Sequence, residues 1–245
     1  MRPSGAGELT TGLRAPMDPG PTALPRIDRT DSLEKVLELA APELDPDVIK
    51  LALESQANAV RDGLVLDPLT LTVIDYSRPS DEARLFVFDL DAGRLLFKDL
   101  VAHGRNSGEL RATQFSNVEG SFMTSLGLFR TLDPYVGEHG LSLRLEGLEP
   151  GFNDHAFDRG IVIHGADYVS GAFARREGRI GRSLGCPALP LASARRIIER
   201  IRGGSAVFSY FPEARWLSES RFFNEDGVPV AGSLRAAHGV RARSL

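Results

Sequence analysis

The sequence of 245 residues contains a single cysteine and no excess of positive charge. With Cys186 alone, an internal disulfide framework is impossible. The formal net charge of −4 argues against a nucleic-acid-binding protein, because such proteins are usually basic. No run approaches the roughly 18 apolar residues that a membrane-spanning helix needs. The hydrophobic content of 42% is nevertheless enough for a sizeable core, so these absences leave a globular protein.

The two ends of the chain differ from its middle in composition. The first residues are rich in Gly and Pro, and we expect a disordered leader over residues 1–30. This segment lacks the apolar region of a signal peptide. The protein therefore stays inside the cell, or an export signal precedes this start, or the start codon lies too late. The polar residues 218–245 predict an irregular tail.

Residues 31–63 predict a small helical segment. In "DSLEKVLELAA" the apolar residues recur at helical spacing, and Pro42 ends the pattern. In the following "LDPDVIKLALESQANAVRDG", Asp45 is a suitable N-cap and Pro46 a suitable first helical residue. We expect Gly63 to close this second helix.

Residues 64–217 predict a mainly β domain with few helices. The expected strands cover residues 69–77, 84–90, 94–102, 126–133, 142–148, 160–165 and 205–211. One helix is expected after Cys186, because apolar residues from Leu191 to Ile201 line one face and Gly203 follows.

Two segments carry residues suited to chemistry. His164 and Gly165 end the apolar strand, whereas Ser183, Gly185 and Cys186 lie on a turn that leads into the helix. A free thiol is only a few per cent thiolate at neutral pH, so a cysteine nucleophile needs an activating partner such as histidine. The N–H groups of Gly185 and Cys186 are candidates for an oxyanion hole. The alternative is that Cys186 is a buried space-filler, as lone cysteines often are.

The order of these segments resembles one family. "RGIVIHGADYVSG" (159–171) followed by "GRSLGCPALP" (181–190) is similar to the catalytic motif of YkuD-type L,D-transpeptidases, a histidine segment followed by Ser/Thr-x-Gly-Cys. Together with "VAHGRNSGE" and "GEHGLSLRLEGLE", these segments resemble the murein L,D-transpeptidase catalytic domain family over residues 69–212.

The resemblance implies a mainly β, sandwich-like YkuD fold and a cysteine acyltransferase. Cys186 would attack the third residue of a peptidoglycan stem peptide and expel the terminal D-alanine, and an acceptor amine would resolve the thioester. His164 would be the general base, and the carbonyl of Gly165 would orient it. Carbapenem β-lactams would acylate the same cysteine. The resemblance implies no metal and no cofactor.

Five arginines lie within or between the two motif segments, and two interpretations stay open. They form a solvated surface, or one or two of them bind stem-peptide carboxylates through the bidentate guanidinium geometry. Arg182 is the best-placed candidate for substrate binding. The five arginines are Arg159, Arg175, Arg176, Arg179 and Arg182.

His103 and His139 repeat the His-Gly pair of the active segment. They lack a second ligand at metal-like spacing, which argues against a zinc site. We expect them to structure the cleft, with His103 among the substrate-binding candidates. Tyr168 is predicted to be either a wall of the cleft or a packing residue.

Two rivals to the transpeptidase interpretation remain. A hydrolase of the same fold would pass the acyl group to water, and a catalytically silent wall-binding module would use its thiol only for structure. Because peptidoglycan lies outside the cytoplasmic membrane, the family resemblance predicts a location in the periplasm or cell envelope.

Overall fold

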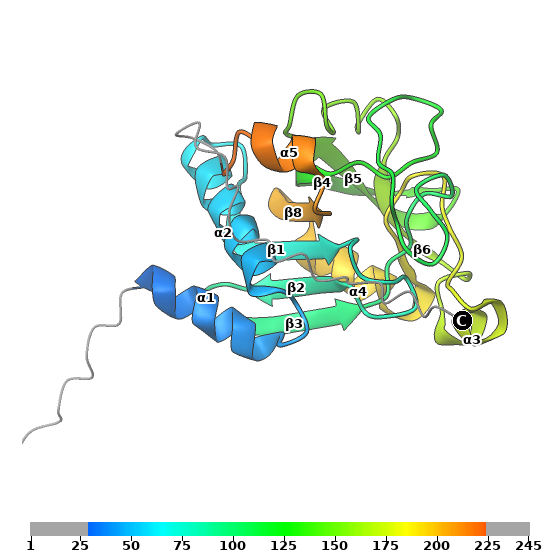
Figure 1. Cartoon of the computed structure of the whole chain (residues 1–245), viewed down its shortest axis with the longest axis horizontal. Coiled ribbons are helices and arrows are strands. Elements are labelled where there is room, and N and C mark those ends of the chain that lie inside the picture. The colour runs from blue at the N-terminus through cyan, green and yellow to red at the C-terminus, as the bar shows by residue number, and fades with distance from the viewer. Residues whose placement is uncertain (1–28, 224–245) are drawn as a thin grey trace, which may run out of the picture.

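The computed structural model describes residues 29–223 of the chain (Figure 1). The expected leader therefore lies almost wholly outside the described residues, as does most of the expected tail. Two N-terminal helices precede the strands, two further helices lie between strands, and a last helix follows the final strand. The helices are α1 (Arg29–Ala40), α2 (Pro46–Arg61), α3 (Gly171–Glu177), α4 (Leu191–Ile201) and α5 (Ala214–Glu219). The strands are β1 (Asp67–Asp75), β2 (Leu85–Asp89), β3 (Arg94–Asp99), β4 (Gly127–Gly137), β5 (Gly140–Gly147), β6 (Val162–Ala166), β7 (Ala188–Pro190) and β8 (Ser205–Tyr210).

The strands form one mixed sheet in the order β3-β2-β1-β8-β4-β5-β6-β7. β1 pairs with β8 and β6 with β7 in parallel, and the other neighbours are antiparallel. Ala102, just beyond edge strand β3, bridges Ala188 in the opposite edge strand β7. This bridge brings the two edges together, so the sheet is nearly closed like a barrel. The prediction of a mainly β domain with a few helices is confirmed.

Both faces of the sheet are covered, as β2 illustrates. Successive side chains of a strand point to opposite faces. Phe86 and Phe88 lie in one hydrophobic core with α1 and α2, whereas Leu85 and Val87 lie in a second core with α4. A strand buried on both faces reads as a continuous apolar run, which is how "LFVF" appears in the sequence.

The predicted start of α2 is confirmed in detail. Asp45 adopts an extended conformation, and its side chain accepts a hydrogen bond from the N–H of Asp47, with Pro46 in the first turn. Within the helix, Ile49 and Gln56 are buried. The buried face packs against β1, so the helical segment and the sheet share a core.

Helix α4 begins directly after β7 and packs against the two strands, β6 and β7, that carry or adjoin the motif residues. Ala194, Ile197, Ile198 and Ile201 form its buried face, as the sequence predicts. This face packs against β6 and β7 and contributes to the second core. The helix therefore holds the strand that contains the candidate histidine and the strand that follows the candidate cysteine.

Helix α5 closes the first core at the C-terminal end. Trp216 is fully buried, and its indole Nε1–H donates to Glu149 at 2.9 Å. Phe222 is also buried in this core, so the ordered structure continues beyond residue 217. These contacts were not anticipated from the polar composition of the segment.

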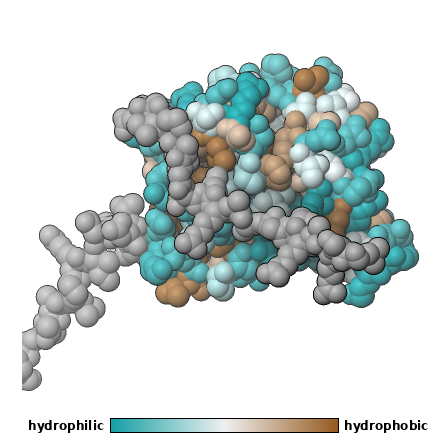
Figure 2. All heavy atoms as spheres, in the orientation of Figure 1, coloured by the Kyte–Doolittle hydropathy of each residue, from teal (hydrophilic) through white to brown (hydrophobic). Residues whose placement is uncertain are grey.

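The face of the molecule in Figure 2 is mainly hydrophilic, and its hydrophobic residues lie in small separate patches. Scattered exposed apolar side chains of this kind are normal for globular proteins. Across residues 29–223, no helix has both the length and the apolar character that a bilayer crossing requires.

Candidate active site

The structure brings the two predicted motif segments side by side. His164 lies in β6 and pairs in parallel register with Ala188 of β7. Cys186 lies on the turn two residues before Ala188, and the backbone N–H of His164 donates to the carbonyl of Pro187 at 3.4 Å. The predicted nucleophile and the predicted base therefore occupy neighbouring backbone segments.

The Cys186 thiol is half-buried against the chain that enters β6. The backbone N–H of Val162 donates to Sγ at 3.4 Å, and Sγ lies 3.7 Å from the carbonyl oxygen of Gly160. Burial raises the pKa of the thiol above its ordinary value, whereas the Val162 N–H and the charge of Arg159 act in the opposite direction. With these contacts, the protonated thiol of Cys186 is favoured over the thiolate.

His164 is held by its own backbone and by a second histidine. Its Nδ1 lies 3.0 Å from the carbonyl oxygen of Gly165, and its ring stacks on that of His139. A proton on Nδ1 would satisfy the carbonyl and leave the lone pair on Nε2, the tautomer that a general base needs. Burial lowers the pKa of His164, the Gly165 carbonyl opposes this, and the charge of His139 adds to it. Within the described residues, His164 and the Cys186 thiol form no direct hydrogen bond.

Ser183 shapes the turn that presents the cysteine. Its hydroxyl donates to the carbonyl oxygen of Cys186 at 2.6 Å and accepts from the N–H of Gly185 at 3.1 Å. Gly185 has φ +129°, a conformation that favours glycine. Because the Gly185 N–H is engaged, the Cys186 N–H is the more available of the two predicted oxyanion donors.

Thr124 supports this turn from a distant part of the chain. Its hydroxyl donates to the carbonyl oxygen of Gly185 at 3.3 Å and accepts from the N–H of Gly104 at 2.9 Å. Gly104 in turn forms a bridge with Ser183. Nothing in the local sequence indicated Thr124, because it is an isolated threonine in a segment without regular periodicity.

The sequence of this domain also matches a model of a known protein family. A family model described as the L,D-transpeptidase catalytic domain matches residues 40–210. The chain belongs to this family. The match runs from the end of α1 to the end of β8 and includes both motif segments.

The chain is also similar, at low sequence identity, to solved structures of L,D-transpeptidases. An L,D-transpeptidase from Mycobacterium smegmatis has 16% identity and a TM-score of 0.38, with 58% of this chain and 59% of that chain covered. The L,D-transpeptidase LdtMt1 in complex with imipenem has 14% identity and a TM-score of 0.37, with 58% and 59% covered. One from Stackebrandtia nassauensis has 12% identity and a TM-score of 0.38, with 74% and 76% covered.

The chain thus spans less than two thirds of the length of the mycobacterial L,D-transpeptidase. No protein among the curated sequences matches the chain significantly. The family assignment rests on the family model.

Arg182 of this L,D-transpeptidase domain faces a neighbouring loop. Its Nη1 donates to the carbonyl oxygens of Arg105 at 3.0 Å and Gly108 at 2.9 Å, and pairs with Glu109 Oε1 at 2.7 Å. These bonds tie the loop to the turn that precedes Cys186. A role of Arg182 in substrate binding stays a prediction. For that role, its guanidinium would have to contact the substrate in addition to these three partners.

His103 and Tyr168, the other two predicted substrate-binding residues, each contact a neighbouring backbone segment. His103 is buried, with Nδ1 2.7 Å from Arg84 Nη2 and Nε2 3.2 Å from the Gly108 carbonyl oxygen. Burial, together with the charge of Arg84, lowers the pKa of His103 to about 4. Tyr168 is half-buried, its carbonyl accepts from the Gly181 N–H at 2.8 Å, and burial raises its pKa to about 12. Substrate contacts of these two residues stay predictions.

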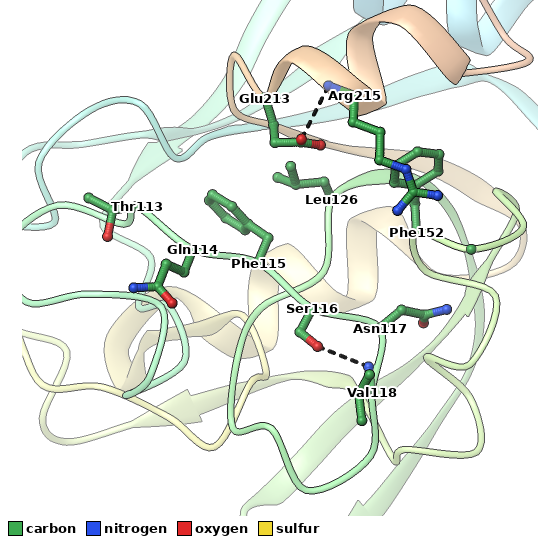
Figure 3. Close-up of a pocket in the computed structure, with 11 residues that line it drawn as sticks. Thr113, Gln114, Phe115, Ser116, Asn117, Val118, Leu126, Phe152, Glu213 and Arg215 are labelled. Atoms are coloured by element: carbon green, nitrogen blue, oxygen red, sulfur yellow. Dashed lines mark hydrogen bonds between the residues drawn. The ribbon is translucent and has the colours of Figure 1, made fainter.

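A cavity of about 470 Å³ lies away from the thiol (Figure 3). It contains none of the residues predicted for the site. The segment from Thr113 to Val118 forms one wall, and Phe152, Glu213 and Arg215 lie across from it. Residues 29–223 contain no cluster of His, Cys, Asp or Glu side chains arranged to hold a metal ion.

Proposed function

We propose that the protein is a cysteine-dependent L,D-transpeptidase acting on peptidoglycan stem peptides. The observation that carries this proposal is the placement of Cys186 and His164 on adjoining segments of a domain that belongs to the L,D-transpeptidase family. The hydrogen-bonded contact between His164 Nδ1 and the Gly165 carbonyl supports the general-base role of the ring.

In the proposed reaction, His164 Nε2 takes the thiol proton, and Cys186 Sγ attacks the carbonyl carbon at the third residue of the stem peptide. The C–N bond to the terminal D-alanine breaks, and the imidazolium returns the proton to the departing amine. The amine of a neighbouring stem then attacks the thioester and gives one proton to His164 Nε2; the amide C–N bond forms, the C–S bond breaks, and the proton returns to the released thiolate. The Cys186 N–H is proposed to stabilise the oxyanion of both steps.

The thiol must exchange its present contacts before this reaction. In the structure, Sγ contacts Val162 N and Gly160 O, and its pKa is raised by burial. Catalytic hydrogen bonds often shorten only when substrate is bound. We therefore expect the thiol to turn toward His164 in the substrate complex.

Intact-protein mass spectrometry after incubation with a carbapenem tests the proposal. We expect one adduct on the wild-type protein and none on Cys186→Ala, since a β-lactam acylates an activated cysteine. Ser193→Ala, at the start of α4, is a matched control that should retain the adduct. An unmodified wild-type protein whose Cys186 also resists a small alkylating reagent would contradict the proposal and favour a silent wall-binding module.

The fate of the acyl-enzyme separates cross-linking from trimming. Incubation with a stem tetrapeptide and an acceptor peptide should give the cross-linked dimer for a transpeptidase. Release of the tripeptide alone would identify a hydrolase of the same fold. A substrate in peptidoglycan also implies a location in the periplasm or cell envelope, which a reporter fusion to the natural start would test.

A further inference from the structure

The side chain of Arg159 is a half-buried cation whose hydrogen bonds all go to uncharged groups. Its Nη1 donates to the Ser116 carbonyl at 2.7 Å and to Ser125 Oγ at 2.5 Å. Its Nη2 donates to the Met123 carbonyl at 2.8 Å and to Ser121 Oγ at 3.3 Å. Within the described residues, the guanidinium has no carboxylate partner, so its positive charge is held without being neutralised.

This charge lies against the cysteine turn. The thiol contacts Gly160 O and Val162 N, which directly follow Arg159 in the chain. From the other side, a Cβ on Gly185 would lie 3.6 Å from Arg159 Nη2 and 3.0 Å from the Met123 carbonyl oxygen. The guanidinium therefore occupies the space between the turn that presents Cys186 and the loop of residues 116–125.

An activated cysteine needs a nearby positive charge, because a buried thiolate is otherwise unfavourable. A neutral His164 does not supply that charge before proton transfer. A guanidinium remains protonated near neutral pH. It can therefore favour the thiolate both before the reaction and when the thioester is resolved.

We propose that Arg159 is a positioning residue that supplies the fixed positive charge for the Cys186 thiolate and fastens the 116–125 loop against the cysteine turn. The proposal rests on the proposed function, since it gives Arg159 a part in the same cysteine chemistry. Burial raises the pKa of Cys186 and lowers that of Arg159, and the attraction between the two groups opposes both shifts, which agrees with the geometry.

The wall that Arg159 fastens is also a wall of the cavity in Figure 3. Ser116 lines that cavity, and its backbone carbonyl accepts the hydrogen bond from Arg159 Nη1. Its hydroxyl is engaged elsewhere, accepting from the N–H of Val118 at 3.0 Å. Arg159 therefore links the cysteine turn to a loop that has few regular backbone hydrogen bonds of its own.

The pH dependence of Cys186 alkylation by iodoacetamide tests the proposal, because only the thiolate displaces iodide. In Arg159→Met we expect the thiol pKa to rise by about one unit or more, which lowers the alkylation rate at pH 7 about tenfold. Arg159→Lys keeps the charge and should recover most of the rate. Ser121→Ala removes the 3.3 Å hydrogen bond from Arg159 and the 3.4 Å hydrogen bond from the Met123 N–H but leaves the charge in place, so it serves as the control, with a profile close to that of the wild type.

A folded Arg159→Met variant whose profile superimposes on that of the wild type would overturn the proposal. Circular dichroism establishes whether the variant folds. If it does not, the wild-type protein alone provides the test through its rates with anionic iodoacetate and neutral iodoacetamide. We expect the ratio of these rates to exceed that of glutathione several-fold, since a fixed cation attracts the anionic reagent. A ratio equal to that of glutathione would contradict the proposal.

These measurements use small reagents and do not depend on a peptidoglycan substrate. Failure of carbapenem acylation would contradict the proposed function while leaving the thiol titration unchanged. An unchanged titration in Arg159→Met would reject the role of Arg159 even if the wild-type protein is acylated. The two outcomes are therefore separable.

Discussion

The imidazole rings of His139 and His164 stack with their centroids 4.4 Å apart and their planes 24° from parallel. His139 lies between the end of β4 and the start of β5, so the tip of this hairpin covers one face of the His164 ring. Two imidazolium ions at this distance would repel each other. The stack therefore favours a neutral His164, which is the form that accepts a proton from a thiol.

We expect His139→Ala to raise the pKa of His164 by up to about one unit, because both the stacked charge and part of the burial are removed. The acid limb of the pH profile for Cys186 acylation should move to higher pH by the same amount. Nuclear magnetic resonance titration of the His164 ring measures the shift directly. His139→Phe keeps an aromatic ring and removes only the charge, so its shift should be smaller. An identical His164 titration in all three proteins would contradict this prediction.

The pairing of His103 with Arg84 predicts a loss of stability in acid. The pKa of His103 is about 4 in the folded protein, against 6.5 as its ordinary value. Between these values the unfolded chain binds more protons, so the free energy of unfolding falls as the pH falls from 6.5 toward 4. The difference in pKa corresponds to about 3 kcal/mol over this window.

Urea unfolding of the wild type and of His103→Gln at pH 7 and pH 4.5 measures this effect. The glutamine does not titrate, so the variant should lose less stability between the two pH values even though it starts less stable. The contribution of His164 is present in both proteins and cancels in the comparison. Equal losses in the two proteins would show that His103 does not carry the acid sensitivity.

Local patterns in the sequence predict the helices and turns that are determined by residues within or next to them. Asp45 and Pro46 mark the start of α2, and the apolar face from Ala194 to Ile201 marks α4. The hairpin of β2 and β3 turns at the predicted residues 91–93. In each case the cap, the turn or the periodicity lies within the element itself. Strand β7, with three residues, is too short to show a periodicity and was not anticipated.

The residues of the candidate site also fall into two groups, those that a local sequence motif predicts and those that it does not. Cys186, His164 and Ser183 stand in a recognisable motif, and the structure places them on adjacent segments. Thr124 could not be found from spacing, and Arg159 was indicated only as one of several arginines, because their partners lie far away in the chain: Thr124 bonds Gly185, 61 residues on, and Arg159 bonds Ser116, 43 residues back. Such contacts depend on how the loops fold over the sheet, which no local pattern records.

Thr124 is predicted to matter for both acylation and folding. Thr124→Val preserves the shape of the side chain but removes the hydroxyl that joins Gly104 N to the Gly185 carbonyl. Leaving a buried N–H without its acceptor costs about 1–3 kcal/mol. We expect a lower melting temperature and a several-fold slower acylation of Cys186, measured by mass spectrometry over time. Thr124→Ser retains the hydroxyl and should restore most of the rate; if Ser and Val behave alike, the hydroxyl does not position the turn.

Gly104 is predicted to tolerate no side chain. A Cβ at this position would overlap the backbone carbonyl oxygen of Phe122 and lie 3.0 Å from Cα of Gly185. Both obstacles are backbone atoms, so Gly104→Ala must displace either the 122–124 segment or the cysteine turn. We expect a destabilisation of about 1–3 kcal/mol by urea unfolding, together with slower carbapenem acylation. Gly171→Ala, where the new Cβ meets only the end of the Arg175 side chain at 3.4 Å, is the matched control and should leave both quantities nearly unchanged. Wild-type stability and acylation in Gly104→Ala would show that this close approach does not set the position of Cys186.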